Sequence, residues 1–243
     1  MDWGSDRVET PPGAGTIDVW TAGLDPVVPA LTEFAADLSA DEHARAARFA
    51  SPRDRNRFIV GRAFLRRLLA RYLGGSAQAV RLRQGMHGKP AVEGDRVSFN
   101  LAHSGDLAVC AIGPGGQELG VDVERIRPLS DEAGVAGLIL SPGERQDLEL
   151  LPGPQRLRRL LQIWTCKEAV LKGVGTGLDR SLARLEVTFA AGDEPRVRDL
   201  DAEDAALMPP FRLHLIEPAE GFVGAVATRM RVAGVRVVPW RWQ

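Results

Sequence analysis

The segment from Ser51 to Gly75 constrains the fold most, because it contains a long helix with clear signals at both ends. Ser51 followed by Pro52 is typical of an N-cap and a first helical turn, and Gly74 with Gly75 ends the helix. Apolar residues recur at helical spacing and predict one buried face, made of Phe58, Gly61, Leu65, Leu68, Leu69 and Tyr72. The sequence therefore predicts an amphipathic helix that buries this face in a core.

Basic residues gather on and around this helix. Between His43 and Pro90 there are 12 Lys and Arg residues against one acid, Asp54, although the whole chain has a net charge of -1. We expect the helix arginines to occupy its remaining surface, at Arg53, Arg57, Arg62, Arg66 and Arg71. Such an excess indicates a polyanionic partner, which is a nucleic acid, a membrane surface or a phosphate-rich small molecule. A solvated arginine-rich face explains the same pattern.

Composition narrows the class of protein. With 243 residues, 44% of them hydrophobic, the chain can build one large or two small cores. The cysteines, Cys110 and Cys166, have no metal-type spacing and predict no disulfide framework, so a reducing cytoplasm is the expected location. No apolar run reaches the ~18 residues of a membrane span, and Met1–Gly15 does not read as a secretion signal.

Turn residues and periodicity divide the remaining chain into short elements. Ser39 and Glu42 predict a capping box for a helix that ends near Arg48. Expected strands cover residues 16–20, 80–83, 97–101, 107–112, 119–124, 185–190, 211–217, 221–228 and 234–238, and expected helices cover 132–140, 144–151 and 155–173. The similar order of elements predicts an α+β chain of two halves, 16–116 and 117–243, after a flexible tail at 1–15.

Two carboxylates alternate with valines in the strand predicted at 119–124. Asp122 and Glu124 are two residues apart, which places them on the same face of a strand. Two carboxylates this close repel each other unless a cation lies between them, and Mg²⁺ prefers such oxygen ligands. The alternative is an ordinary polar outer face, and the spacing alone does not exclude it.

The helix predicted at 155–173 combines cations, an acid and an aromatic ring on one face, made of Trp164, Lys167, Glu168 and Lys172. A core rarely contains such a set. The alternative is that Glu168 and Lys172 form an ordinary i,i+4 ion pair on the helix surface, which stabilises the helix by roughly 0.3 kcal/mol. Glycines at 173, 175 and 177 then end the helix and allow backbone to approach a ligand closely.

These two segments carry a family resemblance. "GVDVERIRP", followed some forty residues later by "WTCKEAVLKGVGTGL", resembles the paired signature of the Sfp-type 4'-phosphopantetheinyl transferases. "HGKP" at 87–90, "FNLAHSG" at 99–105 and the arginine-rich "RDRNRFIVGRAFLRRLL" resemble further segments of that family. The resemblance covers the chain from Thr16 to the last strands. It implies two pseudo-symmetric α+β halves, with the active site in the cleft between them.

The resemblance also implies an activity and its partners. An enzyme of this type moves 4'-phosphopantetheine from its substrate coenzyme A to a serine of an apo acyl or peptidyl carrier protein and releases 3',5'-ADP. The reaction depends on Mg²⁺, for which Mn²⁺ can substitute. The length of two halves implies a monomer, and neither nucleic acid nor membrane is an expected partner. Carriers of fatty acid, polyketide or nonribosomal peptide synthesis remain equally open.

The resemblance assigns the metal and the chemistry to the second half. Asp122, Glu124 and Glu168 would hold the metal. Glu168, acting directly or through a metal-bound water, or else Glu144 would accept the serine proton, and the sequence does not decide between them. Lys172 would reach a pyrophosphate oxygen as a point charge, and Lys167 would position Glu168 or the phosphates.

Coenzyme A recognition falls mainly in the first half. By resemblance, His103 contacts a phosphate, Arg57 contacts the 3'-phosphate with help from Arg48 and Arg53, and the loop of Gly88, Lys89 and Pro90 runs along the adenine. Three residues depart from some relatives: Glu42 replaces a lysine, and Ala102 and Phe58 replace hydroxyl residues. Part of the 3'-phosphate clamp is therefore in doubt. Carrier docking would use residues 125–151, with Arg125 and Arg127 at the rim.

Two rival functions stay open on the residues alone. A metal-dependent hydrolase of coenzyme A or a similar diphosphate would use the same carboxylates with water as the nucleophile. A non-enzymatic module would bind nucleic acid through the arginine-rich helix, and its binding would depend strongly on salt.

Overall fold

The helix expected from Ser51 to Gly75 forms as α3 (Pro52–Leu73) in the computed structural model, which describes residues 15–25, 30–85, 88–175, 181–190, 194–200 and 211–242. The Ser51 hydroxyl accepts a hydrogen bond from the Asp54 N–H, and Gly74 follows the helix with a φ of 76°. The C-terminal part of the predicted face is confirmed, since Leu65, Leu68, Leu69 and Tyr72 are all buried, whereas Phe58 and Gly61 are half-buried.

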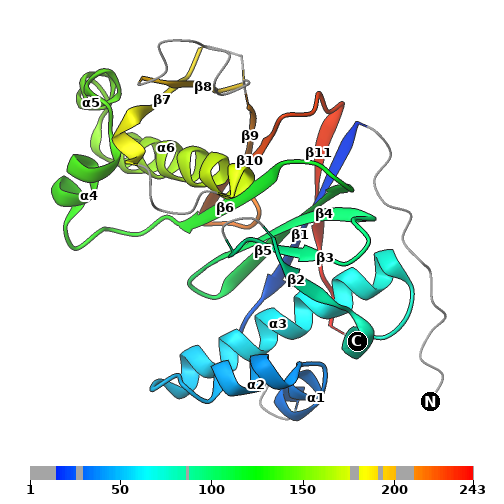
Figure 1. Cartoon of the computed structure of the whole chain (residues 1–243). Coiled ribbons are helices and arrows are strands. Elements are labelled where there is room, and N and C mark those ends of the chain that lie inside the picture. The colour runs from blue at the N-terminus through cyan, green and yellow to red at the C-terminus, as the bar shows by residue number, and fades with distance from the viewer. Residues whose placement is uncertain are drawn as a thin grey trace.

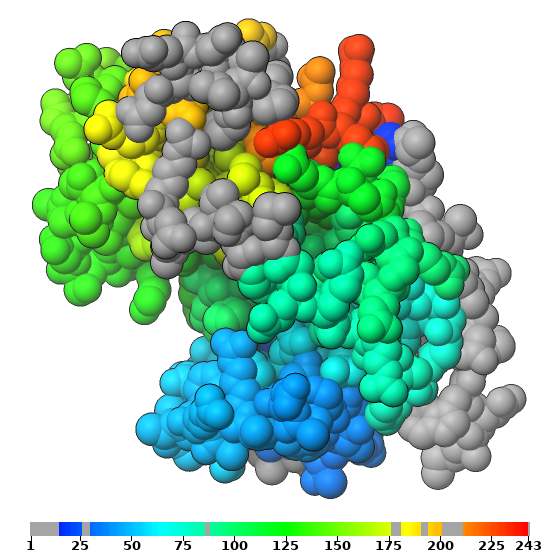
Figure 2. Space-filling model, in the orientation of Figure 1, coloured from blue at the N-terminus to red at the C-terminus, as the bar shows by residue number. Residues whose placement is uncertain are grey.

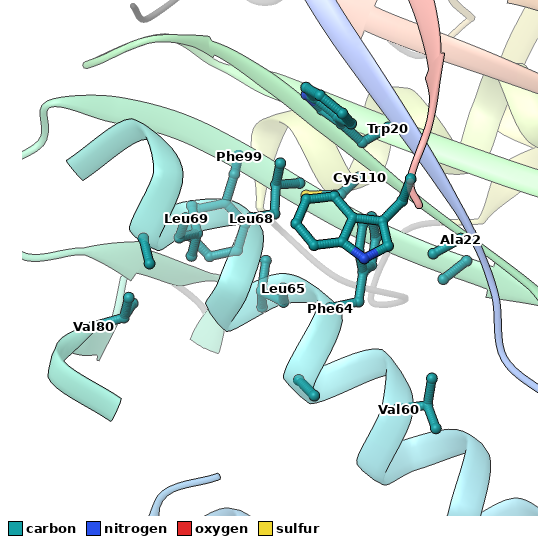
Figure 3. Packing of buried hydrophobic residues seen from close by; sticks show 14 of the residues in the cluster. Trp20, Ala22, Val60, Phe64, Leu65, Leu68, Leu69, Val80, Phe99 and Cys110 are labelled. Atoms are coloured by element: carbon teal, nitrogen blue, oxygen red, sulfur yellow. The ribbon is translucent and has the colours of Figure 1, made fainter. Parts of the chain in front are cut away.

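Helix α3 packs on the first of two sheets (Figure 1). This sheet has the strand order β11-β1-β5-β4, made of β11 (Gly234–Pro239), β1 (Thr16–Gly23), β5 (Leu107–Pro114) and β4 (Val97–Ser104). Figure 3 shows Phe64, Leu65 and Leu68 of α3 packed beneath Trp20 and Cys110 of the sheet. The short helices α1 (Leu31–Ala36) and α2 (Ala40–Ala46) cover the other side of α3, and a hairpin of β2 (Leu82–Gln84) and β3 (Pro90–Val92) follows it.

The second sheet carries the other long helix. Its order is β6-β10-β9-β8-β7, with strands β6 (Leu119–Arg125), β10 (Phe222–Thr228), β9 (Arg212–Ile216), β8 (Arg196–Asp199) and β7 (Leu185–Thr188). Helix α6 (Gly153–Val174) buries Cys166, Ala169 and Val170 against this sheet. Helices α4 (Glu132–Ile139) and α5 (Pro142–Glu149) lie beside α6 and form a small core with it.

The two sheets share a hydrophobic core. Ile17 and Val19 of β1 pack in one cluster with Val121 and Val123 of β6 and with Val226 of β10. Polar contacts join the same region, because the Asn100 side chain of β4 accepts a hydrogen bond from the Val121 N–H at 2.8 Å. The fold is therefore mixed α+β, as predicted, with β6 lying where the sheets meet.

The C-terminal strand contradicts the predicted second half of 117–243. Strand β11 pairs in parallel with β1, so it belongs to the first sheet. Trp240 and Trp242, which follow it, pack in the core of the first half around Phe64. Pairing with the edge of β1 and burial of the two tryptophans in this core place the C-terminal strand in the first sheet. Periodicity within the strand does not predict such long-range pairing.

Element types agree well with the sequence, and most differences are at boundaries. The capping box of Ser39 and Glu42 is present at the start of α2. The helix expected over 144–151 begins two residues earlier as α5. Pro142 occupies its first turn, after a second capping box made by Ser141 and Glu144. The prediction missed α1, β3 and β8, which are all six residues or shorter. None of the described helices is long and apolar enough to cross a membrane.

Candidate functional site

Two glycines let α6 lie directly on β6. A Cβ atom added to Gly120 would lie 1.9 Å from the Ala169 carbonyl oxygen, and one added to Gly173 would lie 2.7 Å from the Phe211 ring. Neither position has room for a side chain. This close contact brings Asp122 of β6 beside Lys172 of α6, so the two sequence motifs meet in space.

Asp122 is the central group of the site. It is 5% exposed, its Oδ1 accepts a hydrogen bond from the Lys172 Nζ at 2.6 Å, and its Oδ2 is buried without a hydrogen-bond partner. The pKa of the Asp122 carboxyl is raised to about 7, chiefly by burial; Lys172 opposes this shift, and the nearby Glu124 and Glu168 add to it. Burial and Glu124 also raise the pKa of Glu168. Three carboxylates therefore interact around one buried oxygen.

Asp122, Glu124 and Glu168 are the candidate ligands for a metal ion. Within the described ranges, no three His, Cys, Asp or Glu side chains stand close enough to hold an ion as they are placed, and the Lys172 ammonium neutralises Asp122 instead. The donor set nevertheless fits Mg²⁺, because Asp122 has an unpartnered buried carboxylate oxygen and lies near enough to Glu124 and Glu168 for their charges to raise its pKa. Burying such a charge is costly unless a cation compensates it.

Glu124 and His103 complete this part of the site. The Ser104 hydroxyl donates a 2.7 Å hydrogen bond to Glu124 Oε2, which joins β4 to β6 at their ends. His103 is exposed beside it. Partial desolvation by neighbouring protein atoms lowers the pKa of the His103 imidazole. The Lys172 and Arg57 cations lower this pKa as well, whereas the Glu124 carboxylate raises it. Charged residues from both halves therefore shift the pKa of this imidazole.

The four residues of α6 that were predicted to share one face point in two directions. Glu168 and Lys172 face the carboxylates of β6, whereas Trp164 packs with the core of α4 and α5. Lys167 follows Trp164: its side chain is fully buried, and its Nζ donates to Glu144 Oε2 and to the Ile139 carbonyl oxygen, both at 2.6 Å. The expectation that all four residues share one face was therefore wrong.

Glu144 is enclosed by structural partners. Its Oε2 accepts hydrogen bonds from the Ser141 N–H at 2.7 Å and from Lys167, and its Oε1 accepts one from the Val187 N–H at 2.6 Å. The residue is 3% exposed. Both carboxylate oxygens are thus occupied in holding α5, α6 and β7 together, and the structure does not bring Glu144 to the acids around Asp122.

Arginines from the start of α3 converge on one acid of the preceding loop. Arg57 makes a bidentate contact with Asp25, at 2.6 and 2.7 Å, and Arg53 adds a contact at 3.2 Å. Hydrogen bonding to Arg57 lowers the pKa of Asp25 to about 2. Arg57 is the better buried of the two arginines, with a side chain 17% exposed against 69% for Arg53.

Other helix arginines are internal, which corrects their predicted surface position. Arg66 is 4% exposed and contacts Glu42 and the carbonyl oxygens of Ala77 and Val80. Arg62 contacts the same Glu42. The counterions lie outside the segment from His43 to Pro90, so the local excess of charge overstated the free positive surface. Glu42, which replaces a lysine of some relatives, thus pairs with arginines of α3.

Arg48 lies apart from Arg53 and Arg57 in an open pocket near the end of α2. The pocket is lined by Arg48, Arg45, Phe49, Ala44 and Asp41. The Arg45 guanidinium lies 5.3 Å from the centre of the Phe58 ring, which itself packs on Phe49. Two cations and an aromatic wall suit a planar anion. In Figure 2, the surface is hollowed between the helices of the first half and the green helices of the second.

The loop predicted to run along adenine presents its lysine differently from expectation. Gly88 has a φ of 80° and no neighbour near a Cβ position, and Pro90 is exposed at the start of β3. The Lys89 Nζ instead donates to the carbonyl oxygens of Leu119, at 2.8 Å, and Gly173, at 3.0 Å. Burial lowers the pKa of Lys89 to about 8. His87 lies outside the described residues.

Sequence reasoning missed three residues of this region, Asp25, Ser104 and Arg45. Ser104 lies inside the quoted segment 99–105, where its position directly after His103 was a usable signal, and Arg45 precedes the arginine-rich segment that begins at Arg53. Asp25 had none, since its role depends on the fold placing the end of β1 beside the start of α3.

Comparison with known proteins agrees with this geometry. Residues 118–227 match the model of the 4'-phosphopantetheinyl transferase superfamily, and residues 24–114 match that of the 4'-phosphopantetheinyl transferase N-terminal region. The 4'-phosphopantetheinyl transferase HetI of Nostoc sp. is 36% identical over 231 residues, which are 93% of this chain and 91% of that protein. The chain belongs to the 4'-phosphopantetheinyl transferase family.

More distant members of the family cover less of the chain. The 4'-phosphopantetheinyl transferase Sfp of Bacillus subtilis is 26% identical over 155 residues, 63% of this chain and 67% of that protein. A crystal structure of the holo-[acyl-carrier-protein] synthase of Neisseria meningitidis aligns with a TM-score of 0.40 and 22% identity, over 45% of this chain and 94% of that one.

Proposed function

We propose that this transferase moves the 4'-phosphopantetheine of coenzyme A onto a serine of an apo acyl or peptidyl carrier protein, with Mg²⁺ and with release of 3',5'-ADP. The observation that carries the proposal is the buried, unpartnered Asp122 oxygen beside Glu124 and Glu168. Asp122, Glu124 and Glu168 would hold the metal. When bound, Mg²⁺ supplies positive charge against the pyrophosphate and the leaving 3',5'-ADP.

Glu168 is the base that the geometry favours. Its pKa is raised, so its carboxylate accepts a proton more readily than an ordinary glutamate. Glu144 has both oxygens engaged in buried hydrogen bonds. The serine oxygen would attack the β-phosphorus, the bond to the 3',5'-ADP oxygen would break, and the serine proton would pass to Glu168.

Cations of both halves would hold the substrate. The Lys172 ammonium donates a hydrogen bond to Asp122 in the free protein. When coenzyme A binds, it would donate to a pyrophosphate oxygen instead. Lys172 and Arg57 each lie near enough to His103 to lower its pKa, and His103 and Arg57 would bind phosphate groups of coenzyme A. Arg48 and Arg53 extend the basic surface outward. Ion pairs already neutralise the buried arginines of α3, which weakens the rival reading of a nucleic-acid module.

The test is the mass of a carrier protein after incubation with coenzyme A and Mg²⁺. We expect wild-type protein to add the mass of phosphopantetheine, and Asp122→Asn to add none in the same time. Glu33→Gln, which changes an exposed acid of α1, is the matched control and should match wild type. Release of 3',5'-ADP without a heavier carrier would identify a hydrolase instead. Fatty acid, polyketide and nonribosomal peptide carriers tested in parallel would define the range.

Carrier docking is expected at α4 and the adjoining loop. Of the apolar residues there, Ile139 and Leu140 are buried and Val135 packs against the core, but Leu138 is 75% exposed. Leu138→Asp should therefore raise the KM for the carrier and leave the KM for coenzyme A unchanged. An unchanged carrier KM would place docking elsewhere, for example at Arg125 and Arg127.

A further inference from the structure

The chain uses lysine sparingly. Of its 31 Lys and Arg residues, three are lysines, namely Lys89, Lys167 and Lys172. Each ammonium donates hydrogen bonds to oxygen atoms of the second half, and Lys89 alone among them comes from the first. An ammonium is a compact donor with three protons in a tetrahedral arrangement, whereas a guanidinium is a flat fork. Lys89 and Lys167 each reach two oxygens in this way, and Lys172 reaches one carboxylate oxygen.

Lys89 contacts two backbone positions that flank the site. Leu119 begins β6, three residues before Asp122, and Gly173 follows Lys172 in the last turn of α6. The Gly173 carbonyl is one of those that a helix end leaves without an internal partner, and the negative end of the helix dipole favours a cation there. One ammonium thus ties together the ends of the two elements that carry the site.

The turn that presents Lys89 is itself tightly held. The Gly85 N–H donates to the Lys89 carbonyl oxygen at 2.7 Å, and the Gly88 N–H donates to the Gly85 carbonyl oxygen at 3.1 Å. A Cβ atom on Gly85 would lie 2.8 Å from the Lys89 carbonyl oxygen, so the turn has no room for a side chain there. The backbone of Lys89 is therefore fixed to the first half while its side chain is fixed to the second.

We propose that Lys89 is a positioning residue that joins the two halves at the cleft. By holding the carbonyl oxygens of Leu119 and Gly173 together, it sets the placement of Asp122 and Lys172 relative to the turn at 85–89. Lys89 then acts on transfer through these residues and does not bind a phosphate itself. Burial of its ammonium, which lowers its pKa to about 8, agrees with an internal role. The kinetic part of this inference rests on the proposed function.

Hydrogen exchange tests the contact without any activity. Lys89→Met keeps the apolar stem and removes the ammonium, and we expect peptides covering 119–125 and 168–175 to exchange about tenfold faster than in wild type. Arg83→Met is the matched control, because Arg83 lies in the same hairpin and pairs with Asp95 at the surface. Unchanged exchange in Lys89→Met would overturn the proposal, and this holds even for a protein that transfers nothing.

Kinetics with two substrates separates positioning from direct contact. We expect Lys89→Met to lower kcat/KM by roughly 10–100-fold, the scale of a misplaced reacting group. The loss should be equal for coenzyme A and for 3'-dephospho-coenzyme A. A loss that disappears with 3'-dephospho-coenzyme A would show that Lys89 binds the 3'-phosphate and would overturn the proposal. Wild-type protein inactive on every carrier would instead remove the proposed function.

Chemical rescue gives a third readout. Lys89→Ala leaves room for n-propylammonium, which can donate to both carbonyl oxygens, and we expect it to restore activity at least fivefold, roughly the scale of one hydrogen bond. Tetramethylammonium at equal ionic strength has no N–H donor and should restore none. Equal rescue by both cations would contradict the proposal. If Lys89→Ala does not fold, the two measurements on Lys89→Met decide.

Discussion

The arginine-bearing helix of the first half and the site at Asp122 treat buried charge in opposite ways. In the first half, several buried or half-buried arginines of α3 pair with carboxylates, as Arg66 does with Glu42 and Arg67 with Asp37, while Arg71 lies over the Trp240 ring. In the second half, the buried Asp122 has one oxygen paired with Lys172 and one oxygen with no partner. A satisfied network stabilises a fold, whereas an unsatisfied buried acid is stable only when something else binds it. The comparison separates scaffold from site.

Removing the unsatisfied acid should give the largest effect. Asp122→Asn is expected to lower transfer on the order of 10³-fold, the scale of losing a charge-stabilising group in phosphoryl transfer. Folding should tolerate the change, because the amide no longer buries a charge. Steady-state kinetics and thermal melts of the same preparation measure both effects. A parallel loss of stability and activity would show that Asp122 belongs to the scaffold.

The same acid predicts a pH dependence. Its pKa of about 7 in the folded protein lies above the 3.8 of a solvated aspartate, so between these two pH values the folded state binds a proton that the unfolded state has released. The stability of metal-free protein should therefore fall as pH rises from about 4 to about 7. Adding Mg²⁺ should recover stability at pH 7, and chelation should remove it. Urea titrations across this range check the slope, which Asp122→Asn should flatten.

Breaking a satisfied buried pair should cost stability first. Lys167→Met leaves Glu144 buried without its cation and should cost about 3–5 kcal/mol. Arg83→Met, which breaks a pair with side chains 46% and 62% exposed, should cost less than about 1 kcal/mol. Denaturant unfolding measures both. Equal costs would mean that burial does not set the value of these pairs.

Separating the strand from the helix should have an intermediate effect. Gly120→Ala places a Cβ where the Ala169 carbonyl oxygen lies, so β6 and α6 must move apart, at a cost of about 1–3 kcal/mol. Activity should fall more than stability, because Asp122 and Lys172 sit on the separated elements. Gly153→Ala, where a Cβ meets no atom within 4 Å, is the control at the start of α6.

The smallest effect is expected at the surface of the first half. Asp25→Asn weakens the contact with Arg57, but Asp25 is 46% exposed, so the cost should stay below about 1 kcal/mol at neutral pH. Because the pKa of Asp25 is lowered to about 2, the wild-type advantage should disappear as pH falls from about 4 to 2. Unfolding at pH 7 and pH 2 compares the two proteins.

Local patterns predicted the elements, and paired motifs predicted the site. Ser51 and Pro52 set the start of α3, and the alternation around Asp122 set β6, because capping and periodicity act over a few residues. Long-range pairing was not predictable in this way. Nothing near Lys167 signals that its ammonium reaches Glu144, and nothing near Arg66 signals Glu42, since such contacts depend on how elements pack.

The position of β11 has a consequence for synthesis of the chain. Arg236 of β11 contacts Asp18 of β1 at 2.8 and 2.9 Å across 218 residues of sequence. The first sheet therefore lacks an edge strand, and its core lacks Trp240, until the ribosome has synthesised residues 234–240. Such distant pairing is slow to form. The first half cannot be completed as an independent unit during translation, although its residues emerge first.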